Sequence, residues 1–473
     1  MKTSASMLGA PLALVGVVAL ALVVRLAGAG DRLTADEGYS WLVGSAPDVG
    51  SFLNRLAAFE NTPPLFYALL TPLPLDDEVW IRLPSIVAGV ASVAALYYAV
   101  RALAGSRVGL MAALVLAVAP YHVIFSNSSR GFVLAGLGLV LALWAAARLV
   151  RGGDQRWWVL YAGGAVVALY SEYDAALTLV PLAGALIVAG LRPWRRVALL
   201  GLAPLLSLVP WTPELLRSLD KLNETKTAPD YPDPTPGVVR DEIVPLFFGE
   251  HGATYSAGVH TLQFLAVAGA LALAAWLLWR GEGQVAPGPE PPAVRRPVFW
   301  LLAGTAAGAL VLHALAAYAG LDLFSTRYLT ALLPLCAALL ACGVALVPWR
   351  SALPLAAAVL IALGVAVFLH REGRELEPDL GRAETSARGA DAQVILTNSS
   401  VVAFYLRDLQ VVLDRPFGLG PGLEQETRAD GLPYAVVDRR RIGDGPRPGP
   451  GRSMTLSAPG GEFVVRLVPK PDA

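Results

Sequence analysis

Long apolar runs separated by short polar segments follow one another along most of the chain. A helix needs roughly 20 apolar residues to cross the hydrocarbon core of a bilayer. By this measure we predict eleven spans, at residues 7–29, 84–104, 108–126, 131–149, 157–171, 174–191, 196–212, 260–279, 297–320, 327–347 and 351–369. The pattern predicts a mainly α fold, a polytopic bundle of membrane helices.

The last hundred residues depart from this pattern, because they are polar and carry only short apolar runs. Val394–Thr397 and Gln410–Leu413 are typical of strands, with a helix from Val401 between them, and further strands begin near Tyr434 and Glu462. We therefore predict two domains. Residues 1–370 form a transmembrane domain with large outer loops at 30–83 and 213–259, and residues 371–473 form a small extracytoplasmic α/β domain.

Composition agrees with a membrane protein. Hydrophobic residues make up 55% of the 473 and charged residues only 16%, where a soluble protein has about a quarter. The formal net charge is zero, so no nucleic-acid partner is expected.

The arginines of the short loops orient the predicted spans. Loops of one parity are basic, whereas those of the other parity are mostly acidic. Since Lys and Arg mark the cytoplasmic side, we predict a multi-pass protein of the cell (inner) membrane with a cytoplasmic N-terminus. The arginines concerned are Arg101, Arg107, Arg148, Arg151, Arg156, Arg192, Arg195, Arg196, Arg280, Arg295, Arg296 and Arg350.

Ionisable residues gather at the predicted outer ends of the spans, whose middles are nearly free of charge. A transporter is expected to place ionisable groups near the bilayer midplane instead. The distribution therefore favours an enzyme that works at the membrane surface. The residues are Arg25, Asp36, Glu37, Arg82, His122, Arg130, Glu172, Asp174, Asp322 and Arg327.

Five motifs in this outer region occur in a recognisable order. Asp36-Glu37 follows the first span, and then come Glu60-Asn-Thr-Pro-Pro-Leu-Phe-Tyr67, Arg82-Leu-Pro-Ser85, Ser126-Asn-Ser-Ser-Arg-Gly131 and Phe324-Ser-Thr-Arg-Tyr-Leu329. Over about residues 7–350 the chain resembles the GT-C polytopic glycosyltransferases related to protein O-mannosyltransferases and lipid A aminoarabinose transferases.

Two positions depart from the family pattern. Thr62 stands where many members have His or Lys, and Asn127-Ser-Ser129 stands where many have an acidic residue. We interpret these departures as signs of a changed acceptor or donor, and they also leave open a catalytically inactive GT-C-like scaffold. A second alternative, a transporter or flippase of lipid-linked sugars, would instead require essential polar groups within the spans.

The resemblance implies transfer of a sugar, with inversion, from a polyprenyl-phosphate donor to a lipid, glycan or protein acceptor on the extracytoplasmic face. The partners are then the donor, the acceptor and membrane lipids. Asp36 is the candidate base that takes the proton of the acceptor, and Glu37 assists it or positions the acceptor. The alternative for this pair is a helix cap or a solvated loop acid.

The remaining candidates follow from the chemistry of the donor. Guanidinium groups bind phosphate oxygens bidentately, which favours Arg327 and then Arg130 as ligands of the donor phosphate, unless they are interface or ion-pair arginines. Arg82 is expected to order the loop. Candidates for acceptor or substrate binding are Glu60, Tyr39, Glu172 and Tyr328. No cofactor is predicted with certainty; a divalent metal stays open, with Glu60, His251 and His260 as a weak ligand set.

Overall fold

The computed structural model describes residues 4–224, 233–249, 257–280, 295–321, 323–346, 394–397, 400–405, 410–413, 434–440, 452–458 and 461–468. The chain divides into two compact units. Unit 1 draws on Met1–Gly30, Asn61–Leu69 and Arg82–Gly373, and unit 2 draws on Asp31–Glu60, Leu70–Ile81 and Arg374–Ala473.

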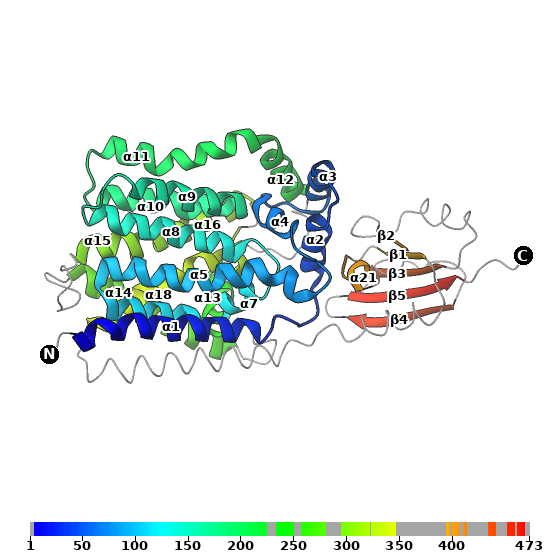
Figure 1. The fold of residues 1–473 in the computed structure, drawn as a ribbon, viewed down its shortest axis with the longest axis horizontal. Coiled ribbons are helices and arrows are strands. Elements are labelled where there is room, and N and C mark those ends of the chain that lie inside the picture. Colours follow the sequence, from blue (N-terminus) through cyan, green and yellow to red (C-terminus); the bar gives the residue numbers. More distant parts are fainter. Residues whose placement is uncertain are drawn as a thin grey trace, which may run out of the picture. The chain divides into compact units, whose positions relative to one another are not determined.

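Unit 1 is helical throughout its described part, and Figure 1 shows most of its long helices lying side by side along one direction. The apolar runs of the sequence become α1 (Ser4–Leu26), α5 (Glu78–Ala104), α6 (Ser106–Ala117), α7 (Pro120–Ser126), α8 (Phe132–Val150), α9 (Trp157–Ser171), α10 (Ala176–Val188), α11 (Trp194–Leu202), α14 (Ala257–Arg280), α15 (Arg295–Phe299), α16 (Thr305–Tyr318) and α18 (Leu333–Ala345). Shorter elements connect them: η1 (Tyr173–Ala175), η2 (Ala203–Trp211), η4 (Trp300–Gly304), α17 (Thr326–Leu329) and η5 (Thr330–Leu332).

The length and apolar composition of these helices indicate a membrane protein. Within the described residues six helices are long and apolar enough to cross a bilayer, or seven if α6 and α7 count as one span bent by 63°. The bend falls at Pro120, which has no N–H to continue the helical hydrogen bonding. Three further predicted spans correspond to the shorter apolar helices Ala10–Leu26, Trp157–Ser171 and Tyr173–Val188, and the span predicted at 351–369 lies outside the described residues.

Glycines allow two helices of the bundle to pack closely. A Cβ atom added to Gly164 on α9 would lie 2.6 Å from the carbonyl oxygen of Gly138 on α8, and a Cβ on Gly138 would meet the backbone of Gly164 in the same way. Small residues at such crossings let helix backbones approach inside a membrane. The pair therefore fixes the distance between α8 and α9, whose ends carry several candidate residues.

The two predicted outer loops contain helices. Residues 30–83 include α2 (Ala35–Gly44), α3 (Val49–Phe59) and α4 (Leu65–Leu70), and residues 213–259 include most of α12 (Thr212–Glu224) and all of α13 (Pro236–Phe248). Side-chain caps begin three of these helices, because Thr34, Asp48 and Thr235 each accept a hydrogen bond from a backbone N–H of the first turn.

Unit 2 combines α2 and α3 with a five-stranded sheet. Its strands are β1 (Val394–Thr397), β2 (Gln410–Leu413), β3 (Tyr434–Arg440), β4 (Arg452–Ala458) and β5 (Gly461–Val468), in the order β2-β1-β3-β5-β4. β1 pairs in parallel with β2 and β3, whereas β5 is antiparallel to both β3 and β4. The short helix α21 (Ser400–Tyr405) lies between β1 and β2 in sequence.

A small apolar core joins parts of unit 2 that are far apart in the sequence. Phe404 of α21 is buried together with Leu33 and Ile81, and its ring meets the edge of Trp41 on α2 at 5.5 Å. The hydroxyl of Tyr405 accepts from the Leu33 N–H at 2.9 Å and donates to Glu78 at 2.9 Å. The tail and the segment after α1 thus belong to one unit, a grouping that the sequence analysis did not predict.

Candidate functional site

Asp36 and Glu37 occupy the first turn of α2 in unit 2, and their environments differ. Glu37 is buried and completes a capping box, in which its Oε2 accepts from the Thr34 N–H at 2.9 Å while the Thr34 hydroxyl accepts from the Glu37 N–H at 3.4 Å. Asp36 is exposed. Glu37 therefore holds the start of α2, and Asp36 is the carboxylate of the pair that faces solvent.

Tyr39 and Glu60 lie where α2 packs on α3. The Tyr39 ring stacks on Phe59 with 5.9 Å between centroids and 19° between planes. Glu60 follows directly as the C-cap residue of α3, is buried, and donates its N–H to the Leu56 carbonyl at 2.9 Å. The structure thus brings two predicted acceptor-binding residues to neighbouring elements of unit 2.

Arg130 lies in unit 1, in the turn between α7 and α8. Its Nη1 donates to the hydroxyl of Tyr67 at 3.1 Å, and that hydroxyl is 2.7 Å from the Thr62 hydroxyl. The Ser85 hydroxyl donates to the Arg130 carbonyl at 3.2 Å. The arginine is therefore fixed to the two motifs that directly precede its own, Glu60–Tyr67 and Arg82–Ser85. Thr62, one of the family departures, is part of that network.

Glu172 ends α9 and faces the same turn. A Cβ atom added to Gly131 would lie 2.9 Å from Glu172 Oε1 and 2.5 Å from the Ser171 carbonyl oxygen. Glu172 itself is 4% exposed. The two turns are in such close contact that only a glycine fits at position 131 without a shift of its neighbours.

Arg327 and Tyr328 contact each other, and Tyr328 contacts the start of α8. The Arg327 guanidinium lies 5.0 Å from the centroid of the Tyr328 ring, within cation–π range. The Tyr328 ring in turn meets Phe132, the first residue of α8, edge to face at 6.0 Å. Around the start of α8 the structure therefore gathers Arg130, Glu172 and the Arg327–Tyr328 pair, and we call these four residues the α8-start cluster.

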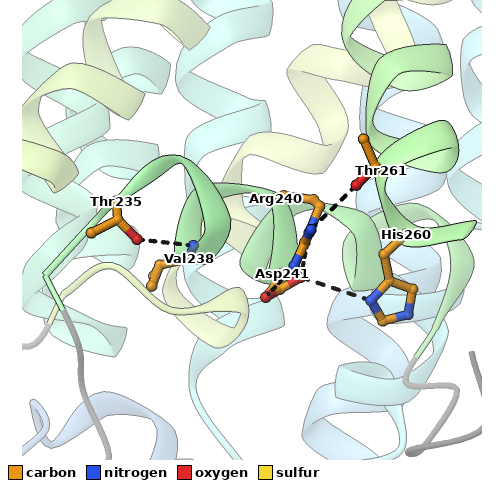
Figure 2. A network of polar contacts seen from close by, with 6 residues as sticks. All are labelled: Thr235, Val238, Arg240, Asp241, His260 and Thr261. Carbon is orange, nitrogen blue, oxygen red and sulfur yellow. Dashed lines mark hydrogen bonds and ion pairs between the residues drawn. The ribbon is translucent and has the colours of Figure 1, made fainter. Parts of the chain in front are cut away.

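A contact from α13 supports the start of α17. Glu242 Oε2 accepts from the Thr326 N–H at 2.5 Å and from its hydroxyl at 2.7 Å. Figure 2 shows the neighbouring network on α13, in which Arg240 forms a bidentate pair with Asp241 and also donates to Thr261 on α14. The hydrogen bonds from Arg240 hold the pKa of Asp241 below its usual range.

The weak metal set of Glu60, His251 and His260 includes His251, which lies outside the described residues. His260 lies with its Nδ1 3.7 Å from Asp241 Oδ1. Among the residues that the structure describes, no three His, Cys, Asp or Glu side chains are close enough to hold a metal ion.

Arg82 is fully buried near the start of α5. Its Nη1 donates to the carbonyl of Ala29 at 3.0 Å and to that of Gly28 at 3.4 Å. The side chain therefore satisfies carbonyl groups at the end of α1, which leaves this arginine with a positioning task within unit 1.

Sequence reasoning missed three polar contacts at this end of unit 1. One is the Glu242–Thr326 contact, and the others are the buried pairs Arg25–His122 and Asp174–His313, whose atoms lie 2.6 and 3.5 Å apart. The available signal was an ionisable residue next to an apolar run, which marks a candidate but does not name its partner.

Comparisons with known proteins identify the fold. The family model of dolichyl-phosphate-mannose-protein mannosyltransferase matches residues 62–216. A comparison with curated protein sequences finds no match. Among solved structures, ArnT from Cupriavidus metallidurans bound to undecaprenyl phosphate is similar with a TM-score of 0.61 and 16% identity, over 95% of this chain and 97% of that one.

Two archaeal structures give the same result. The Archaeoglobus fulgidus oligosaccharyltransferase in complex with Zn and sulfate has a TM-score of 0.55 and 13% identity, over 90% of this chain and 68% of that one. The oligosaccharyltransferase AglB from the same organism, with an inhibitory peptide and a dolichol-phosphate, has a TM-score of 0.53 and 12% identity, over 90% and 69%. The resemblance to GT-C glycosyltransferases is confirmed, and the chain has their fold.

Proposed function

We propose that this membrane protein is a glycosyltransferase that takes a sugar from a polyprenyl-phosphate donor. It transfers the sugar, with inversion, to a lipid, glycan or protein acceptor on the extracytoplasmic face of the cell membrane. The observation that carries the proposal is fold similarity over 95% of the chain to an ArnT structure bound to undecaprenyl phosphate. A lipid-linked donor also fits a bundle whose helices are long and apolar enough to lie in a bilayer.

In this proposal Asp36 is the general base. It takes the proton from the acceptor hydroxyl while the acceptor oxygen forms the new bond to the anomeric carbon. The bond between the anomeric carbon and the phosphate oxygen breaks, and its electron pair stays on that oxygen. The exposed carboxylate on the first turn of α2 suits this task, because it can reach an acceptor from solvent. Glu37 assists by holding the first turn through its capping box.

The leaving phosphate needs compensation of its growing negative charge. We assign this to Arg327 and Arg130, whose guanidinium groups can bind phosphate oxygens bidentately. Tyr328 and Glu172 share the α8-start cluster with them and are assigned to the sugar. Tyr39 and Glu60 of unit 2 are assigned to the acceptor, and Arg82 positions the end of α1.

The test is sugar transfer by the full chain in lipid nanodiscs, with a panel of radiolabelled polyprenyl-phosphate hexoses and pentoses. Asp36→Asn should lower kcat by about 100-fold or more, the usual contribution of a general base. Asp48→Asn is the matched control, since Asp48 is an exposed acid that caps the neighbouring helix α3. An unchanged kcat in Asp36→Asn would exclude Asp36 as the base.

The inactive scaffold stays the second candidate, favoured by Thr62 and by Asn127-Ser-Ser129. The same assay separates the two, because a scaffold gives no transfer from any donor with the wild-type protein. Orientation is tested independently by labelling a cysteine at position 36 with an impermeant maleimide in intact cells. Labelling only after the cells are opened would contradict the extracytoplasmic reaction.

A further inference from the structure

A cavity of about 560 Å³ lies at the end of unit 1 where α8 finishes, and the proposed reaction does not use it. Helix α8 has 19 residues. At 1.5 Å per residue this places the cavity about 28 Å along the helix from the turn that carries Arg130, roughly the thickness of a bilayer core. Six of its lining residues carry the argument: Tyr98, Arg101, Trp144, Arg148, Arg151 and Trp157.

The lining of the cavity is positively charged. Its three arginines come from the end of α5, the end of α8 and the turn that follows α8. Nε of Arg151 donates to the carbonyl of Ala102 at 2.8 Å, which holds that guanidinium against the end of α5. Among the residues that line the cavity in the described part of the chain, none is Asp or Glu. Such a lining attracts an anion, and guanidinium groups are the best side-chain ligands for phosphate oxygens.

One wall of the same cavity is aromatic. Tyr98 stacks on Trp144 with 5.1 Å between centroids, and Trp144 meets Trp157 at 5.9 Å. The Arg148 guanidinium lies over the Trp157 ring at 5.0 Å. Tryptophan and tyrosine concentrate at the level of the lipid headgroups. The wall therefore offers an apolar surface beside the cations at that level.

A simpler role accounts for only part of this arrangement. Arg101 and Arg148 lie in the last turns of their helices, where a cation is favourable because of the helix dipole. That role needs neither a cavity between the arginines nor an aromatic wall beside them. A free phosphate ion would use the arginines and leave the aromatic wall without a function.

We propose that this cavity binds the phosphate headgroup of an anionic membrane phospholipid, in the leaflet opposite to the α8-start cluster. The phosphate lies between the three arginines, and the first carbons of the lipid lie along Tyr98 and Trp144. Basic pockets between membrane helices are suited to such headgroups. The site does not depend on the proposed transfer activity, since none of its residues belongs to the α8-start cluster.

The experiment is native mass spectrometry of the full chain after delipidation, with phosphatidylglycerol or phosphatidylcholine added back. The wild type should retain one phosphatidylglycerol, and phosphatidylcholine should bind about tenfold more weakly or worse. The triple variant Arg101→Gln/Arg148→Gln/Arg151→Gln should bind phosphatidylglycerol more weakly than the wild type by a similar factor. The matched control Arg107→Gln/Arg192→Gln/Arg195→Gln removes the same charge from predicted loops of the same side, outside the cavity lining, and should bind like the wild type.

A second variant tests the proposal independently, in case the triple variant misfolds. Ala102→Phe fills the cavity and keeps every charge, so it should also lose phosphatidylglycerol. Equal lipid retention by the triple variant and the wild type would overturn the proposal. So would equal loss in the control variant, which would indicate general charge attraction, or displacement of the lipid by millimolar inorganic phosphate, which would indicate a site for the free ion.

Discussion

Glu242 on α13 binds Thr326, the first residue of α17, through both donors of the threonine. The backbone N–H and the hydroxyl of Thr326 lie 2.5 and 2.7 Å from the same carboxylate oxygen. Thr326 is buried and directly precedes Arg327. The contact therefore fixes the start of α17, the helix that carries Arg327, the proposed ligand of the donor phosphate.

Replacing Glu242 with alanine should therefore impair donor binding. The substitution leaves the Thr326 donors without a charged acceptor, a loss of roughly 1.5–3 kcal/mol for a hydrogen bond to a charged group. We expect a raised KM for the donor in the transfer assay, with kcat less affected. Asp241→Asn is the control, because Asp241 lies beside Glu242 on α13 and its pair with Arg240 is partly exposed. Equal KM values for Glu242→Ala and the wild type would contradict this positioning role.

The close approach at Gly131 makes a second prediction. Gly131 has a right-handed backbone (φ −68°), so alanine is conformationally allowed there. Its Cβ would nevertheless meet Ser171 and Glu172, and such overpacking costs about 1–3 kcal/mol. Gly131→Ala should lower the free energy of unfolding and the transfer rate together, because the turn of Glu172 must move.

Gly136→Ala is the matched control for this prediction. Gly136 lies in α8, the helix that directly follows Gly131, and a Cβ there meets nothing within 4 Å. Alanine favours a helix over glycine by about 1 kcal/mol, so Gly136→Ala should be neutral or slightly stabilising. If Gly131→Ala also proves neutral in thermal unfolding, the turns around the start of α8 are looser than the structure indicates.

These contacts mark the limit of what the sequence predicts. Apolar runs locate helices, and α9 spans Trp157–Ser171 as predicted, but run length does not reveal a bend such as the one at Pro120. The Thr34-x-x-Glu37 pattern is a recognisable capping box, in agreement with the helix cap that the sequence left open for this pair. The Glu242–Thr326 contact could not, because it joins residues 84 positions apart and nothing local encodes that proximity.

The helix cap at Asp48 predicts a pH dependence in unit 2. The Asp48 carboxylate accepts from the Ser51 N–H at 2.9 Å and from the Ser51 hydroxyl at 2.7 Å, and these bonds lower its pKa below the ordinary value of 3.8. A lowered folded-state pKa stabilises the folded form above the unfolded pKa, and that stabilisation is lost as the pH falls through the folded pKa.

Helix α3 should therefore fray as the pH drops below about 4, the ordinary range of an aspartate. Asp48→Asn keeps a capping side chain but removes the titration. Hydrogen exchange of residues 49–59 should then show the two proteins alike at pH 7, with the wild type losing protection more steeply in acid. Parallel profiles for both proteins would mean that Asp48 does not set the acid sensitivity of α3.

Arg25 connects three helices of unit 1 from a fully buried position. Its Nη2 lies 2.6 Å from His122 Nδ1 on α7, and its Nε donates to the Ser126 hydroxyl at 2.9 Å. Its Nη1 donates to the carbonyl of Ala117 on α6 at 3.2 Å and to that of Ala21 within α1 at 2.8 Å. The guanidinium thus fixes α1 against the bend between α6 and α7.

Removing this arginine should lower the free energy of unfolding. The main reason is the buried polar groups that lose their partner, rather than the loss of the charge itself. Arg25→Met leaves His122 Nδ1 buried without its partner, at about 1–3 kcal/mol for an unsatisfied buried group. The Ser126 hydroxyl keeps its hydrogen bond to the His122 carbonyl. Replacing both members of a buried polar pair is often far less harmful than replacing one. Arg25→Met/His122→Leu should therefore recover part of the lost unfolding free energy, measured by reversible denaturation in mixed micelles as a double-mutant cycle. Strictly additive losses would show that Arg25 and His122 stabilise the bundle independently, despite the 2.6 Å contact between them.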